Sequence, residues 1–166
     1  DISGNAGLNA GATIDFQSAT ATATLNATQN GVVTYANAGE NTQSITLSEV
    51  DTFTTVNTIE AYSGVGGGTV TLGASHAAAD TTMDNTAATT LNVGAQTAAG
   101  TYALAHTEDV LKVTATADIS GINGGAITTA ETLDVSTTGL INTTMTEAQY
   151  EGFTVINASD NNDTIT

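Results

Sequence analysis

Cysteine, proline, tryptophan and arginine are missing from this 166-residue chain, and Lys112 is its only residue with a permanent positive charge. The lack of cysteine leaves the cellular compartment open, because cytosolic and secreted proteins can both lack it. The lack of proline suits a sheet-rich fold, in which every strand must donate ladder hydrogen bonds. One lysine against 17 acidic residues gives a formal net charge of −16. That balance excludes a nucleic-acid binder, which neutralises phosphates with Lys and Arg, and it opposes binding to an anionic membrane surface.

Long apolar runs are also missing. No segment approaches the roughly 18 apolar residues that a membrane-spanning helix needs, and the first residues show neither the basic region nor the apolar core of a signal peptide. Leu, Ile, Val and Phe together make up only about a fifth of the chain, while Thr alone makes up roughly another fifth. A thin core combined with strong self-repulsion indicates that cations or neighbouring copies help the chain to fold.

A short apolar pattern recurs at intervals of 20 to 25 residues. Each copy has two apolar residues separated by one residue in a Thr-rich context, which is typical of a half-buried strand. The β-branched residues Thr and Val also suit a pleated surface. The copies are Ala23-x-Leu25, Ile45-x-Leu47, Val70-x-Leu72, Leu91-x-Val93, Leu111-x-Val113, Leu133-x-Val135 and Phe153-x-Val155.

This interval is about the length of one coil of a parallel β-helix, whose coils stack about 4.8 Å apart with like side chains in ladders. We therefore predict an all-β fold, a parallel β-helix or β-solenoid of about eight short rungs. Residues 1–166 would form one β domain rich in Thr, Ala, Gly and Asn, a segment of a longer or self-assembling protein. An antiparallel β-sandwich is the alternative, because weaker strands between the pairs fit its spacing too, at 31–36, 54–61 and 101–105. Helical turns are expected over 144–153, with Thr146 as N-cap, and over 75–84 as a second candidate, neither longer than about two turns.

Clusters of oxygen-bearing side chains make calcium the best-supported ligand. Ca²⁺ takes six to eight oxygen ligands from carboxylates and carbonyls, and adjacent carboxylates repel one another unless a cation lies between them. The alternative is that Asp and Asn serve as turn formers on a solvated acidic surface. The candidate ligands are Asp160, Asn161, Asn162 and Asp163 in one turn, and the pairs Asp80 with Asp84, Glu49 with Asp51, and Glu108 with Asp109.

Catalysis has little support in the sequence. A glycosidase needs two carboxylates across a cleft, and 17 acidic residues provide many accidental pairs. A lyase acting on acidic sugars needs a cation, and Lys112 lies within a predicted strand, where it is expected to point outward. The two histidines, His76 and His106, are far apart and have no Ser or Cys arrangement near them. We therefore expect a protein that is not an enzyme.

Two segments, 45–72 and 143–166, share an order of features: Ser or Thr with Glu, a Phe, an alternating strand, a polar or glycine-rich turn, and Thr-Val-Thr or Thr-Ile-Thr. The end of the second, "DNNDTIT", resembles a calcium-binding β-roll nonapeptide, Gly-Gly-x-Gly-x-Asp-x-apolar. Asp163 matches its Asp and Ile165 its apolar residue. Ala158, Ser159 and Asn161 replace its glycines.

In the first segment, "SGVGGGTV", Gly64 and Gly66 match glycines and Val70 matches the apolar residue, but Gly68 replaces the Asp. The wider pattern resembles sequences that flank such repeats in RTX-type adhesins and S-layer proteins, which are large secreted bacterial surface proteins. This resemblance implies an extracellular, calcium-assisted, non-catalytic surface structure.

From these observations we expect a structural module of a bacterial extracellular assembly: an S-layer, a matrix filament or an adhesin stalk. Its partners would be copies of itself. The alternative is a calcium-dependent adhesive module that binds surface glycan, and a polysaccharide-active β-helix enzyme is a weaker third possibility. Unpaired strands at the ends of a solenoid would present edges to the next molecule.

Overall fold

The computed structural model describes residues 4, 8, 11–18, 20–36, 44–47, 53–54, 59, 61–65, 67–72, 82–85, 87–95, 97–104, 106–125, 127, 131–159 and 161–166. Among them are short strands, two short α-helices and one 3-10 turn. They are β1 (Thr13–Asp15), β2 (Thr22–Leu25), α1 (Ala27–Asn30), β3 (Thr34–Ala36), β4 (Ser44–Leu47), β5 (Phe53–Thr54), β6 (Ala61–Val65), β7 (Gly68–Thr71), β8 (Thr82–Asn85), β9 (Thr89–Val93), β10 (Thr97–Tyr102), β11 (Val110–Val113), β12 (Ala117–Ile122), η1 (Asn123–Gly125), β13 (Glu131–Val135), β14 (Asn142–Thr144), α2 (Glu147–Gly152), β15 (Phe153–Ala158) and β16 (Thr164–Ile165).

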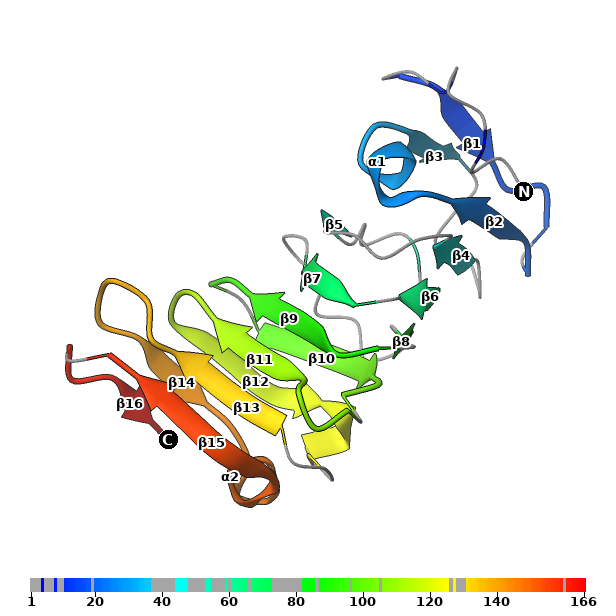
Figure 1. Cartoon of the computed structure of the whole chain (residues 1–166). Helices are drawn as coiled ribbons and strands as arrows, with labels where there is room; N and C mark the ends of the chain where they lie inside the picture. The colour runs from blue at the N-terminus through cyan, green and yellow to red at the C-terminus, as the bar shows by residue number, and fades with distance from the viewer. Residues whose placement is uncertain are drawn as a thin grey trace.

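The chain winds as a β-solenoid in which successive strands alternate between two faces (Figure 1). All even-numbered strands form one eight-stranded sheet, in the order β16-β14-β12-β10-β8-β6-β4-β2. The odd-numbered strands form a six-stranded sheet, from β15 to β5, and the two-stranded sheet β1-β3. Every pairing within the described residues is parallel. The predicted parallel β-solenoid is confirmed, and the antiparallel sandwich is wrong.

Stacked aliphatic side chains form the core between the two faces. In the six-stranded sheet, Val70, Leu91, Leu111 and Leu133 lie in register on consecutive odd strands, and each is 0% exposed. Strand β9 shows why these sequences form strands, since its residues alternate between buried and partly exposed positions. Each coil thus buries only a few side chains, and the core grows by repetition along the stack.

The repeated pairs in the sequence lie on both faces of the solenoid. Ile45-x-Leu47 is on even strand β4, whereas Val70 is on odd strand β7. The wider interval between them is therefore a step from one face to the other. The segments 45–72 and 143–166 diverge for the same reason, because Thr69–Thr71 is on odd strand β7 and Thr164–Ile165 is even strand β16.

The sequence pattern predicts the last apolar pair, Phe153-x-Val155, one residue out of register with the ladder of the preceding strand. Glu131 pairs with Phe153, but Thr132 pairs with Val155, so β15 contains one extra residue at this point. This β-bulge aligns Leu133 with Ile156 rather than with Val155. The inward ladder therefore ends on Ile156, and Phe153-x-Val155 is not the inward pair that the sequence pattern predicted.

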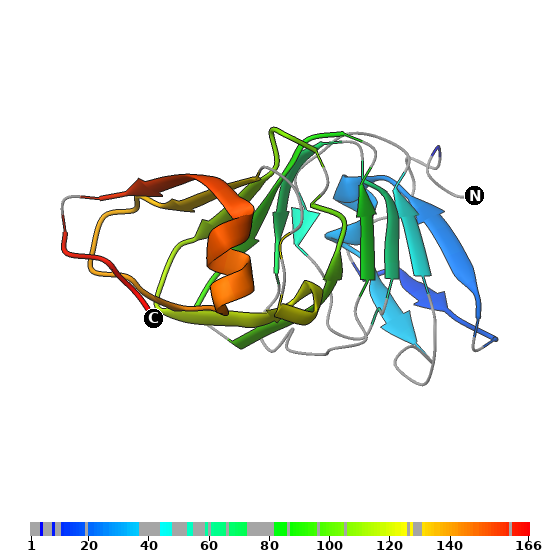
Figure 2. The same cartoon turned by 90° about the horizontal axis from the view of Figure 1, so that it is seen from below.

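Two capped helical turns lie between an even strand and the next odd strand. The predicted turn is α2, and its N-cap is Thr146, as expected; Thr146 and Gln149 form a capping box. The sequence reading missed α1, in which Asn26 and Gln29 make the same capping box. Within the described residues, neither helix has the length or the apolar character to span a bilayer. In Figures 1 and 2, β1 and β16 lie at opposite ends of the stack.

Candidate functional site

The predicted calcium ligands are dispersed where the structure describes them. Asp84 on β8 and Glu108 in the turn before β11 are exposed, whereas Asp109 beside Glu108 is fully buried. Within the described residues, no three His, Cys, Asp or Glu side chains come together as a metal site would require. Four of the candidates, Glu49, Asp51, Asp80 and Asp160, lie outside the described residues, as does His76.

Asp163 ties the last coil to the coil before it. Its Oδ1 accepts a hydrogen bond of 2.9 Å from the backbone N–H of Ile141, 22 residues earlier. Its Oδ2 accepts from the backbone N–H of Ser159 at 3.0 Å and from the Ser159 hydroxyl at 2.7 Å. The Ser159 hydroxyl bond, with the backbone N–H groups of Ile141 and Ser159, holds the pKa of Asp163 below its usual range. The side chain is thus an acceptor for donors in two coils.

Asp109 makes the same kind of link in the middle of the stack. Its Oδ1 accepts from the backbone N–H of Thr89 at 2.8 Å, 20 residues earlier, and from Asn85 Nδ2 at 3.3 Å. Its Oδ2 accepts from the backbone N–H of His106 at 2.8 Å. We call Asp109 and Asp163 the inter-coil clamps, because each carboxylate joins the loop before its own strand to the preceding coil.

The turn that was predicted to bind calcium is shaped by one of these clamps. Asn161 and Asn162 are exposed, and Asn162 has the left-handed φ of 60° that Asn tolerates in turns. The Asn161 N–H donates to the Ser159 hydroxyl at 3.2 Å, and that hydroxyl donates in turn to Asp163. Among the described residues of this turn, Asn161 and Asn162 are thus exposed, whereas the Asp163 carboxylate accepts hydrogen bonds from the protein.

Lys112 lies on an interior strand of the six-stranded sheet and points outward, as predicted. It makes an ion pair with Asp134 of the next coil, with Nζ and Oδ2 3.1 Å apart. Partial burial on its own would raise the pKa of Asp134. The hydrogen bonds from the Ser136 hydroxyl and N–H and the Lys112 ammonium together outweigh that effect, so the pKa of Asp134 lies below its usual range. The single basic residue therefore links two neighbouring coils.

The strongest surface feature is the open end of the last coil. In the described part of the chain, the large exposed hydrophobic side chains are Leu140, in the turn before interior strand β14, and, at the last coil, Tyr150, Val155 and Ile156, with 59, 51, 47 and 38% of their surface exposed. The last two are on β15, an edge strand, and β16 is the edge strand of the other face. Ile156 continues a ladder whose four preceding members are 0% exposed. Ile156 is the last described member of this ladder.

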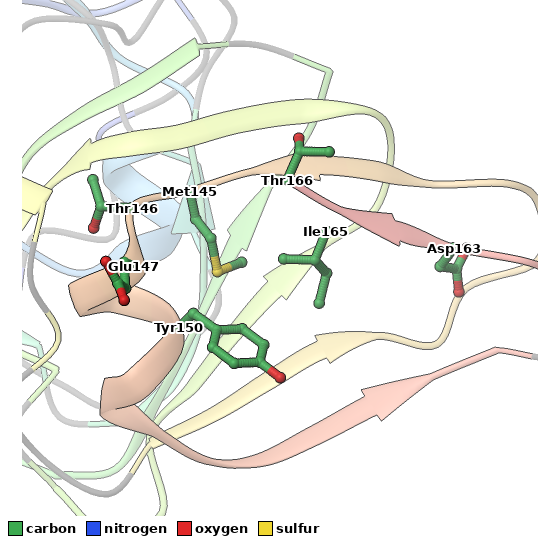
Figure 3. Close-up of a pocket in the computed structure, with 7 residues that line it drawn as sticks. All are labelled: Met145, Thr146, Glu147, Tyr150, Asp163, Ile165 and Thr166. Atoms are coloured by element: carbon green, nitrogen blue, oxygen red, sulfur yellow. The ribbon is translucent and has the colours of Figure 1, made fainter.

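A pocket of about 560 Å³ opens at this end of the solenoid. Figure 3 shows Met145, Tyr150 and Ile165 gathered inside it, with Glu147 and Asp163 toward its two sides. Thr146 and Thr166 complete the lining. Its lining thus comes from helix α2, strand β16 and the residues next to them.

Helix α2 holds this end in shape. Gln149 is 0% exposed, and its Nε2 donates to the carbonyl oxygens of Ile119 and Ile122 at 2.8 and 3.0 Å. Gly152 is packed so tightly that a Cβ there would collide with the backbone oxygen of Ile127. The open coil is thus anchored to the coil beneath it by buried hydrogen bonds and close packing.

The residues of this open end were not singled out as a site from the sequence. The available clue was the apolar pair Phe153-x-Val155 at the start of β15, and the bulge in β15 hid which of its residues face inward. Comparison of the chain with protein-family models, with curated proteins and with solved structures gives no match.

Proposed function

We propose that this chain is a non-catalytic structural module that associates end to end in an extracellular bacterial surface assembly. The observation that carries the proposal is the exposure of Tyr150, Val155 and Ile156 beside β15 and β16, which are edge strands among the described residues. Such edges are templates for pairing with another chain, and contiguous apolar patches mark interaction sites. The acidic, Thr-rich composition and the resemblance to S-layer and RTX-type surface proteins support the extracellular setting.

The size of the exposed patch indicates that a single contact is weak. Fully burying a large aliphatic or aromatic side chain contributes about 1.5–3 kcal/mol, and Tyr150, Val155 and Ile156 are already partly covered. Their burial adds several kcal/mol at most, against an association cost of about 4–15 kcal/mol. Backbone hydrogen bonds along two strand edges supply the remainder. Assembly is therefore expected to depend steeply on protein concentration.

Calcium is part of this proposal as a stabilising cation. A formal net charge of −16 opposes both folding and the approach of a second copy. The amide oxygens of Asn161 and Asn162, beside the Asp163 carboxylate, provide the type of oxygen ligand that Ca²⁺ prefers. A cation at this turn would reduce repulsion next to the open coil.

The test is sedimentation velocity over a wide concentration range, with electron microscopy of the same samples, in millimolar calcium and in chelator. Concentration-dependent growth into filaments or lattices is expected, and growth should be stronger with calcium. A chain that sediments as a monomer at every concentration in both buffers would refute the assembly function. Saturable binding to a glycan without assembly would favour the adhesive alternative.

A further inference from the structure

We infer that Asn123 is a site of spontaneous deamidation in the folded chain, through a succinimide formed with the backbone nitrogen of Gly124. This modification site is independent of the proposed assembly. It follows from three features of one turn: its Asn-Gly sequence, its exposure, and the hydrogen bond that the Asn123 side chain accepts.

The chain contains two Asn-Gly pairs, Asn30–Gly31 and Asn123–Gly124. In such a pair, the backbone nitrogen of the glycine can attack the side-chain carbonyl carbon of the asparagine. Glycine has no Cβ to hinder this approach, and its backbone rotates more freely than that of any other residue. Local sequence therefore favours ring closure at these two pairs, and the fold decides between them.

The fold protects the first pair. Asn30 is the last residue of helix α1 and is 2% exposed, and its Oδ1 accepts a hydrogen bond of 2.6 Å from the Tyr35 hydroxyl. The N–H of Gly31 donates to the carbonyl oxygen of Ala27 at 3.1 Å. The nitrogen that would attack is thus held in the C-terminal cap of the helix, and ring closure at Asn30 requires α1 to open.

The second pair lies in the turn η1, directly after β12. Asn123 and Gly124 have consecutive left-handed φ values of 54° and 65°, a combination for which Asn-Gly is favoured in turns. Asn123 is partly exposed and Gly124 is exposed, and no atom beyond the neighbours of Gly124 in the turn lies within 4 Å of the position of an added Cβ. The peptide between the two residues therefore has room to rotate into the geometry that ring closure needs.

The preceding coil activates the Asn123 side chain. Its Oδ1 accepts a hydrogen bond of 2.6 Å from the backbone N–H of Tyr102, 21 residues earlier. This N–H draws electron density from the side-chain carbonyl and stabilises the negative charge that Oδ1 acquires when the Gly124 nitrogen attacks. It acts as an oxyanion donor, a type of group whose removal from enzymes lowers the rate by about 10²–10³-fold.

The reaction consumes only water. The Gly124 nitrogen gives its proton to solvent and forms a bond to Cγ of Asn123. The bond between Cγ and Nδ2 then breaks, and the nitrogen leaves as ammonia after taking a proton from solvent. Water opens the succinimide at either carbonyl, which gives aspartate or isoaspartate, each with one more negative charge than the asparagine.

The modification acts on a contact between coils. The clamps Asp109 and Asp163 accept backbone N–H groups 20 and 22 residues earlier, and Asn123 accepts one 21 residues earlier. Opening of the ring to aspartate gives a third clamp with a charge-assisted hydrogen bond, which is stronger than a neutral one. Isoaspartate instead adds a methylene group to the backbone and displaces the acceptor.

The test is incubation of the folded chain in mildly alkaline buffer, followed by cleavage after glutamate and mass spectrometry. Cleavage gives the fragment 109–131, in which Asn123 is the only asparagine, and the fragment 1–40, which contains Asn30. A parallel incubation in denaturing urea gives the rates for the unfolded chain. Asn123→Gln is the matched control, because its longer side chain would have to close a larger and less favourable ring.

In the folded chain, Asn123 should deamidate at least as fast as it does in urea. Asn30 should deamidate more than about tenfold slower in the folded chain than in urea, because α1 must first open locally. In urea the two asparagines should react at similar rates. Asn123→Gln should remove the mass change from the fragment 109–131.

Two results would overturn the inference. A rate at Asn123 that is far lower in the folded chain than in urea would show that the hydrogen bond from Tyr102 locks the side chain against attack. Equal rates at Asn30 and Asn123 in the folded chain would show that the fold does not select between the two pairs. Neither result bears on the assembly, which sedimentation tests separately.

Discussion

Replacing the buried clamp Asp109 with Ala should destabilise the solenoid strongly, whether or not calcium is present. The substitution removes the acceptor for three donors: the backbone N–H groups of Thr89 and His106 and the side-chain amide of Asn85. Thr89 and Asn85 are buried, so their donors would have no ready access to water. Hydrogen bonds to charged groups contribute about 1.5–3 kcal/mol each, and a buried unsatisfied donor costs about 1–3 kcal/mol.

Because the Asn85 contact is long, at 3.3 Å, we count mainly the two backbone bonds and expect a loss of about 3–5 kcal/mol in the free energy of unfolding. That is a large share of the 5–15 kcal/mol typical of a domain. At about 2–4 °C per kcal/mol for a chain of this size, the melting temperature should fall by about 10 °C.

The assay is urea unfolding followed by circular dichroism, in chelator and in millimolar calcium, with Glu108→Ala as the matched control. Glu108 is the exposed neighbour of Asp109, and surface substitutions usually change stability by less than about 0.5 kcal/mol. If Asp109 acts as a clamp, its effect persists in chelator. An effect that is present with calcium and lost in chelator would refute the clamp and make Asp109 a metal ligand. Equal, small effects of both substitutions would refute the clamp as well.

Four further outcomes are expected. Gly152→Ala should lower the free energy of unfolding by about 1–3 kcal/mol, because a Cβ there would collide with the backbone of Ile127. Gly94→Ala, with nothing within 4 Å of the added Cβ, should be neutral in the same urea titration. Equal effects of the two substitutions would contradict the packing argument. Asp163→Asn should destabilise at pH 7 but progressively less in acid. The pKa of Asp163 is lowered in the folded state, so the stabilisation by its carboxylate is present above the unfolded pKa of about 3.9 and is lost as pH falls through the folded value. A difference in the free energy of unfolding between wild type and variant that stays constant from pH 7 to pH 3 would argue against this. Ile156→Lys should abolish concentration-dependent sedimentation and lower the melting temperature of the dilute chain, because most of the Ile156 side chain is covered; undiminished assembly of the folded variant would exclude the open coil as the contact. Calcium should raise the melting temperature relative to chelator by binding the folded state, and identical melts would remove calcium from the proposal.

The interval between apolar pairs predicted the fold because a solenoid buries the same position in every coil. Leu91, Leu111 and Leu133 are consecutive members of one inward ladder, so their spacing reports the length of a coil directly. The pattern does not report which face a strand lies on. For that reason Ile45 and Val70 entered one series although they belong to different sheets, and the bulge at the start of β15 was invisible.

The candidate calcium ligands illustrate a different limit. An Asp in a turn beside Asn residues has the same local sequence whether its carboxylate binds a cation or backbone N–H groups. For Asp163, the decisive partner is the N–H of Ile141, 22 residues earlier, and for Asp109 it is the N–H of Thr89, 20 residues earlier. Only the stacking of coils brings these groups together, so the clamp could be found once the register was known and not before.

The clamps also explain how a chain with a thin core and a large negative charge can hold a regular stack. Each coil buries only a few aliphatic side chains, so stability accumulates from contacts between neighbouring coils. An inter-coil clamp uses one acidic side chain to satisfy backbone N–H groups in two coils at once, and the Lys112–Asp134 ion pair joins two more. These links act between neighbours only, and each coil is therefore stabilised by the coil placed over it. The last described coil has the same inward side chains and strand edges as the others, and exposed apolar surface in place of that cover. The same inward ladder continues to Ile156 in this last described coil, where 38% of the side chain is exposed.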